Sequence, residues 1–357
     1  DGPPLGAAAN TCQPSFPDQN GWLGGDAAFS VPLPDREPDA SLWLFGDTFV
    51  ARGDLSERRF PFVANSIGLS RCGADGFELE TFWGRGDDDE PRGFFVPRPG
   101  EDSDGRPRSA LWYWPFGGFF TADTLFVGLL RVRPASPRGP YRLPFRLTGM
   151  DLARIENHRE PPDRWRIEIV PFSRHPRAMP GAAFVVHEDW LYAFGFFDGH
   201  EGRVGRSPRF LARLPLAALA VPGRPLVEAW QTFDRTGRFV AGLRPETARL
   251  LMTDDATEMS VHRDPTSDRW LAVYAESVPD GDAARPDPVW WRSASRLEGP
   301  WSPRQVLFEI PETKPGTDPN LFCYAAKAHP QLARPGRLLV TYVCNLFARN
   351  ESETLAV

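Results

Sequence analysis

Cysteine is scarce in this chain, which has four among its 357 residues. So few cysteines exclude a fold held together mainly by disulfides, although an even number permits two bridges. None of the four lies in a CxxC motif or a cluster with histidine, which argues against a zinc site. Cys323 and Cys344 lie symmetrically about the turn "LARPGR", so a hairpin there would bring them close enough for a bridge. Cys12 and Cys72 are then left for a second bridge, which implies an oxidising compartment; four reduced, buried thiols are the alternative.

The chain also lacks an excess of positive charge and any long apolar run. Its formal net charge is -6 at pH 7, and the basic residues are mixed with acidic ones, so we expect no nucleic-acid partner. No apolar run approaches the roughly 20 residues that cross a bilayer, so we expect no membrane insertion. The N-terminal segment "DGPPLGAAANTC" lacks the charged-then-apolar order of a signal peptide. If the protein is exported, we expect that its signal has already been removed.

Helical periodicity is nearly absent as well. The only stretches that favour a helix are "PLAALA" near residue 215 and "DLARIENH" near residue 151, and both are too short to dominate the fold. Proline (38 residues) and glycine (32) are instead spread between short apolar and aromatic runs, a pattern typical of many short strands joined by turns. We therefore predict an all-β fold.

Five pairs of such strands recur along the chain at intervals of roughly 60 to 75 residues. The pairs are "GGDAAFSVPL" with "SLWLFGDTFV", "LWYWPFGGFF" with "TLFVGLLRVR", "PGAAFVVHED" with "WLYAFGFFDG", "ATEMSVHRDP" with "RWLAVYAESV", and "YAAKAHPQLA" with "RLLVTYVCNL". Repeated antiparallel units indicate a β-propeller, so we predict one five-bladed domain over residues 20–357, after an N-terminal extension over residues 1–19. Because the innermost strand of each blade lines the central channel, the starts of the five first strands should converge on one funnel.

Two aspartates, Asp26 and Asp47, lie inside the two strands of the first pair. A buried carboxylate costs free energy unless it is paired or hydrogen-bonded, so strands built for a core rarely carry one without a reason. A hairpin closing through "PDREPDA" sets Asp26 opposite about Phe49 and Asp47 opposite about Ala28. If the residue numbers of paired positions add up to an odd number, both carboxyls lie on one face of the hairpin, roughly 5 to 8 Å apart. Their repulsion would raise the pKa of one and leave the other ionised, which divides them into acid and base. The alternative is that one aspartate caps a turn or binds an arginine.

Further candidates come from the other predicted first strands. Glu258 in "DDATEMSVHRD" is a third acid at the same height as Asp26, while Asp254 and Asp255 before it are predicted turn residues. Lys327 is one of two lysines in a chain whose other cations are arginines, which suggests a compact ammonium for a sugar hydroxyl or an acid. His329, two residues on, is expected to orient a carboxylate, bind substrate or ligate a metal ion.

Aromatic and amide side chains complete the predicted pocket. Trp114 in "LWYWPFGGFF" offers a ring on which a sugar can stack, although packing between blades is the alternative. Asn65 in "FVANSIGLS" lies close behind Asp47 along the predicted blade, where it would hydrogen-bond the substrate or the aspartate. Acids, a cation, an imidazole and aromatic walls are what a sugar-cleaving pocket needs; a polar plug that rigidifies the axis is the alternative.

Several of these segments together resemble a known family. The segments "GGDAAFSVPL", "LWLFGDTF", "NSIGLS", "EMSVHRDPTSDRWLAVY", "GPWSP", "KAHPQL" and "LLVTYVCN" are similar to bacterial secreted proteins of domain of unknown function 4185, grouped as the endo-D-arabinanases of glycoside hydrolase family 183. The similarity runs from about residue 20 to residue 346. It implies a five-bladed propeller similar to glycoside hydrolase family 43, and it maps the family's paired acids onto Asp26 and Asp47. Glu258, Lys327 and His329 map as further pocket residues.

The resemblance implies hydrolysis of internal linkages in the D-arabinan of mycobacterial arabinogalactan and lipoarabinomannan by a secreted, cell-surface or periplasmic monomer. Asp26 is expected to act as nucleophile or base, Asp47 as its partner acid and Glu258 as the competing acid. Ala28 and the aromatic "ALWYWPFGGFF" depart from the family's pattern and leave the substrate open. No cofactor is expected to be required, and a calcium ion in the channel near His329 is left open. Two alternatives remain: a non-catalytic propeller that binds cell-wall polysaccharide, and a furanosidase for L-arabinan or fructan.

Overall fold

The computed structural model describes residues 13–34, 36, 40–51, 62–73, 76–86, 88–98, 110–138, 143–198, 207–221, 226–276, 286–318, 321–334 and 336–346. Over these ranges the fold is all-β, and the helical segments are single turns. They are α1 (Leu216–Leu219), η1 (Pro162–Arg164), η3 (Pro311–Thr313) and η4 (Pro330–Leu332). No helix in the described ranges is long and apolar enough to span a membrane.

Most of the strands belong to four larger antiparallel sheets, in which the strands follow one another in chain order. These sheets are β2 (Phe29–Pro32), β3 (Ser41–Phe45), β6 (Ser66–Gly73) and β7 (Gly76–Phe82); β10 (Trp112–Thr121), β11 (Thr124–Arg138), β12 (Leu143–Ile155) and β13 (Ile167–Ser173); β14 (Ala178–His187), β15 (Trp190–Phe197), β16 (Arg209–Pro215), β17 (Gln231–Phe233) and β18 (Phe239–Ala241); and β19 (Ser260–Asp264), β20 (Arg269–Ala275), β21 (Pro288–Ala294) and β22 (Gln305–Glu309).

Three smaller sheets complete the described part of the molecule. They are the hairpin of β23 (Leu321–Ala328) and β24 (Val340–Leu346); the sheet of β1 (Trp22–Gly25), β4 (Thr48–Val50) and β5 (Phe62–Val63); and the pair β8 (Gly84–Arg85) and β9 (Pro91–Arg92). The β1-β4-β5 sheet matters for the site because its strands flank Asp26 and Asp47 in the sequence.

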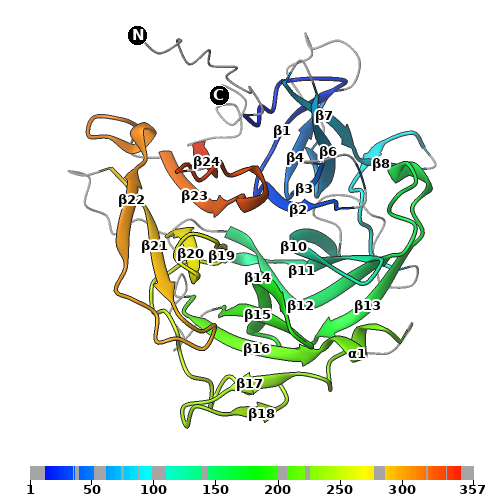
Figure 1. Cartoon of the computed structure of the whole chain (residues 1–357). Helices are drawn as coiled ribbons and strands as arrows, with labels where there is room; N and C mark the ends of the chain where they lie inside the picture. The colour runs from blue at the N-terminus through cyan, green and yellow to red at the C-terminus, as the bar shows by residue number, and fades with distance from the viewer. Residues whose placement is uncertain are drawn as a thin grey trace, which may run out of the picture.

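The first strands of the larger sheets and β23 lie around the centre of the molecule, with the later strands toward the periphery (Figure 1). Contacts join β2 to β10, β10 to β14, β14 to β19 and β19 to β23. Side chains complete the circle, because the ring of His329, just after β23, hydrogen-bonds Ser30 of β2 at 2.6 Å. This succession of antiparallel sheets around one axis is consistent with a β-propeller.

The inner strands depart from regular pairing near the axis. The β10–β11 register shifts between Pro115 and Gly118, and the β14–β15 register shifts between Met179 and Ala183. The β23–β24 register shifts between Tyr324 and Lys327. A bulge bends a strand and re-aims the side chains beside it, so these shifts control which residues face the centre.

Of the two predicted helical stretches, one forms a helix and one does not. The "PLAALA" segment contains α1, whereas "DLARIENH" is wrong as a helix because its first five residues continue β12. Within that stretch Leu152 pairs with Gly128 of β11 and Val170 of β13. Pairing on both sides satisfies the backbone and overrides the weak local preference for a helix.

The described end of the predicted N-terminal extension packs on the first sheet. The ring of Phe16 makes edge-on contacts with Trp43 at 4.9 Å and Phe45 at 5.7 Å between centroids. The backbones of Gln19 and Trp22 exchange hydrogen bonds. Residues 13–19 are therefore anchored by burial of an aromatic ring.

The predicted bridge between Cys323 and Cys344 is present, and the two residues are direct cross-strand partners in the β23–β24 hairpin. Cys72 is also disulfide-bonded. Cys12, its predicted partner, lies outside the described residues. No free cysteine is found in the described part of the chain. The first bridge closes the hairpin that carries Tyr324 and Lys327 toward the axis.

We expect the double variant Cys323→Ala/Cys344→Ala to lose about 3 kcal/mol of unfolding free energy, because the bridge closes a loop with a sequence separation of 21. Denaturant unfolding under non-reducing conditions measures this loss. Unfolding midpoints equal to those of the wild type would show that hairpin packing alone holds β23 and β24.

Candidate active site

The two aspartates predicted from the first pair of strands lie side by side along the backbone. Gly25 pairs with Thr48, and Phe29 pairs with Leu44, so the register places Asp26 opposite the Gly46–Asp47 segment. The backbone N–H of Asp26 donates to the carbonyl of Asp47 at 3.1 Å, and the N–H of Gly46 donates to the carbonyl of Asp26 at 3.1 Å. Asp26 thus lies opposite Asp47 rather than opposite about Phe49, so the pairing is displaced by two residues from the predicted one. The residue numbers of paired positions still add up to an odd number.

Neighbours on two sides fix the carboxyl of Asp26. The hydroxyl of Tyr324 donates to its Oδ2 at 2.9 Å. Its Oδ1 lies over Gly46, where a Cβ atom would be only 2.1 Å away. A residue with a side chain at position 46 would therefore displace the carboxyl, which explains why glycine precedes Asp47.

The surroundings of Asp26 favour its protonated form. Burial, and after it the charge of Glu258, raise the pKa of Asp26; Tyr324, Lys327 and the backbone of Asp47 lower it, and the net result is a rise from 3.8 to about 7. The residue as a whole is only partly buried. A carboxyl with a pKa near neutrality can take up or release a proton at physiological pH.

Glu258 and Lys327 form a buried ion pair beside Asp26. The Lys327 ammonium lies 2.6 Å from Glu258 Oε2, and it also donates to the carbonyl of Ala325 at 2.6 Å. It lies 4.2 Å from the centroid of the Phe29 ring. Burial lowers the pKa of Lys327, and the charge of Glu258 acts against that change. Only 2% of Lys327 and 8% of Glu258 is exposed, so water screens their charges little, and both charges act on the pKa of Asp26.

Trp114 connects the second sheet to Asp47. Its indole N–H donates to Asp47 Oδ1 at 2.6 Å, and its ring packs edge-on against Phe145 at 4.7 Å. The ring is partly exposed. The hydrogen bond orients the carboxyl of Asp47, and the ring forms an aromatic wall beside it.

Tyr324 was not predicted, although it provides the direct contact to Asp26. Tyr324 and Lys327 are three residues apart, so regular alternation would put them on opposite faces of β23. The register shift between them, with Ala325 at φ 60°, turns both toward Asp26. The sequence offered only the tyrosine in "YAAKAHPQL" as a signal, because a bulge cannot be detected from alternation.

Backbone strain occurs at the same place. Ala27 and Ala28, directly after Asp26, have φ values of 70° and 50°, and Ala325 has 60°. Residues other than glycine rarely adopt this conformation, which costs of order 1 kcal/mol or more each and concentrates at functional sites. These three alanines therefore set the direction of the backbone next to Asp26 and just before Lys327.

The structure places Asn65 and His329 in buried networks. The side chain of Asn65 donates to the carbonyls of Phe95 and Tyr113 and accepts from the Phe95 N–H, with 0% of the residue exposed. The ring nitrogens of His329 contact Ser30 at 2.6 Å and Thr341 at 2.8 Å. Burial and then the charge of Lys327 lower the pKa of His329 to about 3. Both side chains join parts of the scaffold in this arrangement.

A second ionic cluster fixes the segment before Glu258. Asp254, predicted as a turn residue, accepts from Tyr274 at 2.6 Å and Arg292 at 2.8 Å. The fully buried Arg209 of β16 lies 3.4 Å from Asp254 and donates to the carbonyl of Ala256 at 2.7 Å. These contacts tie the third sheet to the segment that ends in Glu258.

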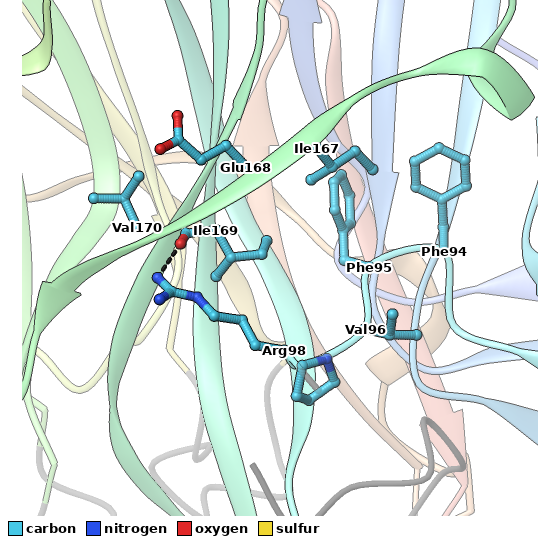
Figure 2. Close-up of a pocket in the computed structure, with 9 residues that line it drawn as sticks. Phe94, Phe95, Val96, Arg98, Ile167, Glu168, Ile169 and Val170 are labelled. Carbon is cyan, nitrogen blue, oxygen red and sulfur yellow. Dashed lines mark hydrogen bonds between the residues drawn. The ribbon is translucent and has the colours of Figure 1, made fainter. Parts of the chain in front are cut away.

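Two cavities of the described structure lie away from Asp26 and Asp47. One, of about 480 Å³, is lined by residues 94–98, which follow β9, and residues 167–170 of β13 (Figure 2). There Arg98 donates to the carbonyl of Ile169, while the Glu168 carboxyl points away (Figure 2). The other, of about 530 Å³, lies against β6 and β7. Neither contains the acid pair, so we locate the site by its chemistry. Among the described residues, no three His, Cys, Asp or Glu side chains are placed to hold a metal ion.

Replacing Lys327 tests the ion pair. Lys327→Met keeps an unbranched stem but leaves the Glu258 carboxylate buried without its cation, so we expect a loss of about 3 to 5 kcal/mol in unfolding free energy. The double variant Lys327→Met/Glu258→Gln should recover part of the loss, because no unpaired charge remains. Equal losses in the two variants, measured by denaturant unfolding, would contradict a strong pair.

Solved structures of similar fold include a presumed hydrolase from Bacteroides ovatus, with a TM-score of 0.66 and 20% identity over 94% of this chain and 82% of that chain. A xylan β-1,4-xylosidase from Bacillus halodurans has a TM-score of 0.45 and 8% identity over 92% of this chain and 50% of its own. An exo-1,5-α-L-arabinanase from a bovine ruminal metagenomic library has a TM-score of 0.41 and 13% identity over 90% of this chain and 88% of its own. The chain spans about half the length of the xylosidase. The similarity to the Bacteroides ovatus structure shows a shared fold.

No curated protein matches the sequence. The sequence model of the family described as "Domain of unknown function (DUF5005)" matches residues 12–354, which is nearly the whole chain. The chain therefore belongs to the DUF5005 family.

Proposed function

We propose that this protein is a glycoside hydrolase that cleaves internal arabinofuranosyl linkages with Asp26 and Asp47 as its reacting acids. The observation that carries the proposal is the juxtaposition of these two residues, linked through their backbones, with the pKa of Asp26 raised to about 7. A pair of carboxyl groups, one of which exchanges its proton near neutral pH, is the equipment of a glycosidase.

In this proposal Asp47 protonates the leaving oxygen while the bond from that oxygen to the anomeric carbon breaks. Asp26 either attacks the anomeric carbon or takes a proton from the water that does so, and the separation of the two carboxyls determines which. The indole of Trp114 orients Asp47 through its 2.6 Å hydrogen bond. Its partly exposed ring would stack against a sugar.

Glu258 has a different role in this scheme from that of a competing acid. Its carboxylate is paired with the Lys327 ammonium at 2.6 Å. We therefore assign it to electrostatic control: its charge raises the pKa of Asp26, and Lys327 limits that rise. Asn65 and His329 have the role of supporting the scaffold, because their polar atoms are occupied by protein partners.

The architecture that we propose is a five-bladed propeller with β2, β10, β14, β19 and β23 as its innermost strands. Its substrate is an arabinofuranose polymer, and the D-arabinan of mycobacterial arabinogalactan and lipoarabinomannan is the first candidate. The substrate assignment rests on the resemblance of the first and last sequence motifs to glycoside hydrolase family 183, and membership of that family is part of the proposal. We propose a secreted monomer.

Product release from mycobacterial arabinogalactan tests the reaction. We expect the wild type to release oligosaccharides, and Asp26→Asn and Asp47→Asn each to lower kcat by about 10²- to 10⁴-fold, because a proton-transfer group is lost. Asp123→Asn, in an exposed turn, is the matched control and should retain the wild-type rate. Chromatography of the products measures all four proteins. Binding of the polymer without release by the wild type would instead identify a polysaccharide-binding propeller.

The pH dependence of kcat/KM tests the role of Asp26. A nucleophile or base must be ionised, and the pKa of Asp26 is raised to about 7. We therefore expect kcat/KM to fall tenfold per pH unit below about pH 7. Absence of this acidic limb, with a fall only on the alkaline side of pH 7, would contradict this role and would make Asp26 the proton donor.

A further inference from the structure

Two side chains of the last hairpin form a chain of hydrogen bonds that ends on Asp26. The amide of Asn345 donates to the hydroxyl of Tyr324 at 3.1 Å, and that hydroxyl donates to Asp26 Oδ2 at 2.9 Å. A phenol has a single proton. Because its oxygen already accepts from Asn345, its proton is directed to Asp26.

Strand pairing sets the geometry of this chain. Phe322 pairs with Asn345, and Tyr324 pairs with Val343, so Tyr324 and Asn345 are diagonal neighbours. The ring of Tyr324 stacks on that of Phe322 at 5.2 Å with an angle of 10° between planes. The Cys323–Cys344 bridge links the residues next to them on the same two strands. The tyrosine is thus held by its ring, its hydroxyl and its backbone.

Tyr324 remains a hydrogen-bond donor at any pH at which the protein works. Burial raises its pKa well above 10, and the negative charges of Asp26, Glu258 and Asp47 raise it further. Donation to a carboxylate stabilises the charged form of that carboxylate. The contact therefore favours the ionised Asp26 that the proposed reaction needs, against the effect of burial.

We propose that Tyr324 and Asn345 are positioning residues, which orient the carboxyl of Asp26 and keep it available as the nucleophile or base. The inference rests on the proposed function for its kinetic consequence but not for the contact itself. Besides burial, four groups act on the ionisation of Asp26: Glu258 opposes it, whereas Lys327, a hydrogen bond from the backbone of Asp47 and the Tyr324 hydroxyl favour it.

The kinetic experiment compares three single variants with the wild type. Tyr324→Phe keeps the ring on Phe322 but removes the donor, so we expect the acidic limb of kcat/KM to move up by about one pH unit. Asn345→Ala should move it in the same direction by less. Tyr342→Phe is the matched control, because Tyr342 lies on β24, the partner strand in the same hairpin, and its hydroxyl bonds Glu312 at 2.8 Å rather than Asp26. An acidic limb that moves equally in Tyr324→Phe and Tyr342→Phe, or in neither, overturns the proposal.

A second measurement needs no substrate. Because the pKa of Asp26 is higher in the folded protein than its ordinary value of 3.8, its contribution to stability is complete below pH 4 and is lost as the pH rises through about 7. In Tyr324→Phe the pKa of Asp26 should be about one unit higher, so this loss of stability should continue to a pH about one unit higher than in the wild type. The stability difference from the wild type should therefore widen between about pH 6 and 9, by about 1.4 kcal/mol per unit of pKa shift.

The two measurements separate the inference from the proposed function. A widening difference in Tyr324→Phe but not in Tyr342→Phe supports the inference, even if the wild type hydrolyses no arabinan, in which case only the proposed function fails. A difference that stays constant from pH 6 to 9 overturns the inference, whatever the activity. Asn345 is exposed, so its variant should fold and provides a check if Tyr324→Phe does not.

Discussion

The arrangement of the site depends on the cost of holding the Asp26 carboxyl in a place with little water and beside the charge of Glu258. Two features offset that cost: the hydrogen bond from Tyr324, and the Lys327 ammonium that pairs with Glu258. The balance leaves a carboxyl that changes protonation near neutrality rather than near pH 4. These groups come from three parts of the chain, namely the segment of Asp26, the segment of Glu258 and strand β23, so the balance exists only when these three parts meet.

Irregular backbone brings the groups into position. The bulge at Ala325 turns Tyr324 and Lys327 to the same side, and the left-handed conformations of Ala27 and Ala28 end the segment that carries Asp26. A regular strand could not place Tyr324 and Lys327 on one side, because alternation would direct two residues three positions apart to opposite faces of the sheet. The ionic cluster around Asp254 has a similar purpose on the fourth sheet, where it anchors the backbone just before Glu258. Strain and buried charge are thus concentrated around one carboxyl.

Much of the fold could be predicted from the sequence, because repeated aromatic runs separated by proline and glycine permit few alternatives to antiparallel strands. The bridge between Cys323 and Cys344 followed from their symmetry about a turn, and the short helix α1 followed from local propensity. The "DLARIENH" helix failed because β11 and β13 pair with that segment from both sides. The predicted register of the first hairpin was displaced by two residues, since the length of its turn could not be read from "PDREPDA".

The sequence by itself determined which residues are chemically unusual: two aspartates in apolar strands, a rare lysine, and a glutamate at the start of another strand. Such residues stand out because burying a charge is costly wherever the strand folds. Only the tertiary structure decided what they do, since Lys327 pairs with Glu258 across 69 positions of sequence and Tyr324 reaches Asp26 across 298. It also moved Asn65 and His329 into scaffold contacts and brought in Tyr324 and Asn345. The physical reason is that a pKa and an orientation belong to a set of neighbours in space, and a bulge or a change of register exchanges those neighbours without a signal in the local pattern.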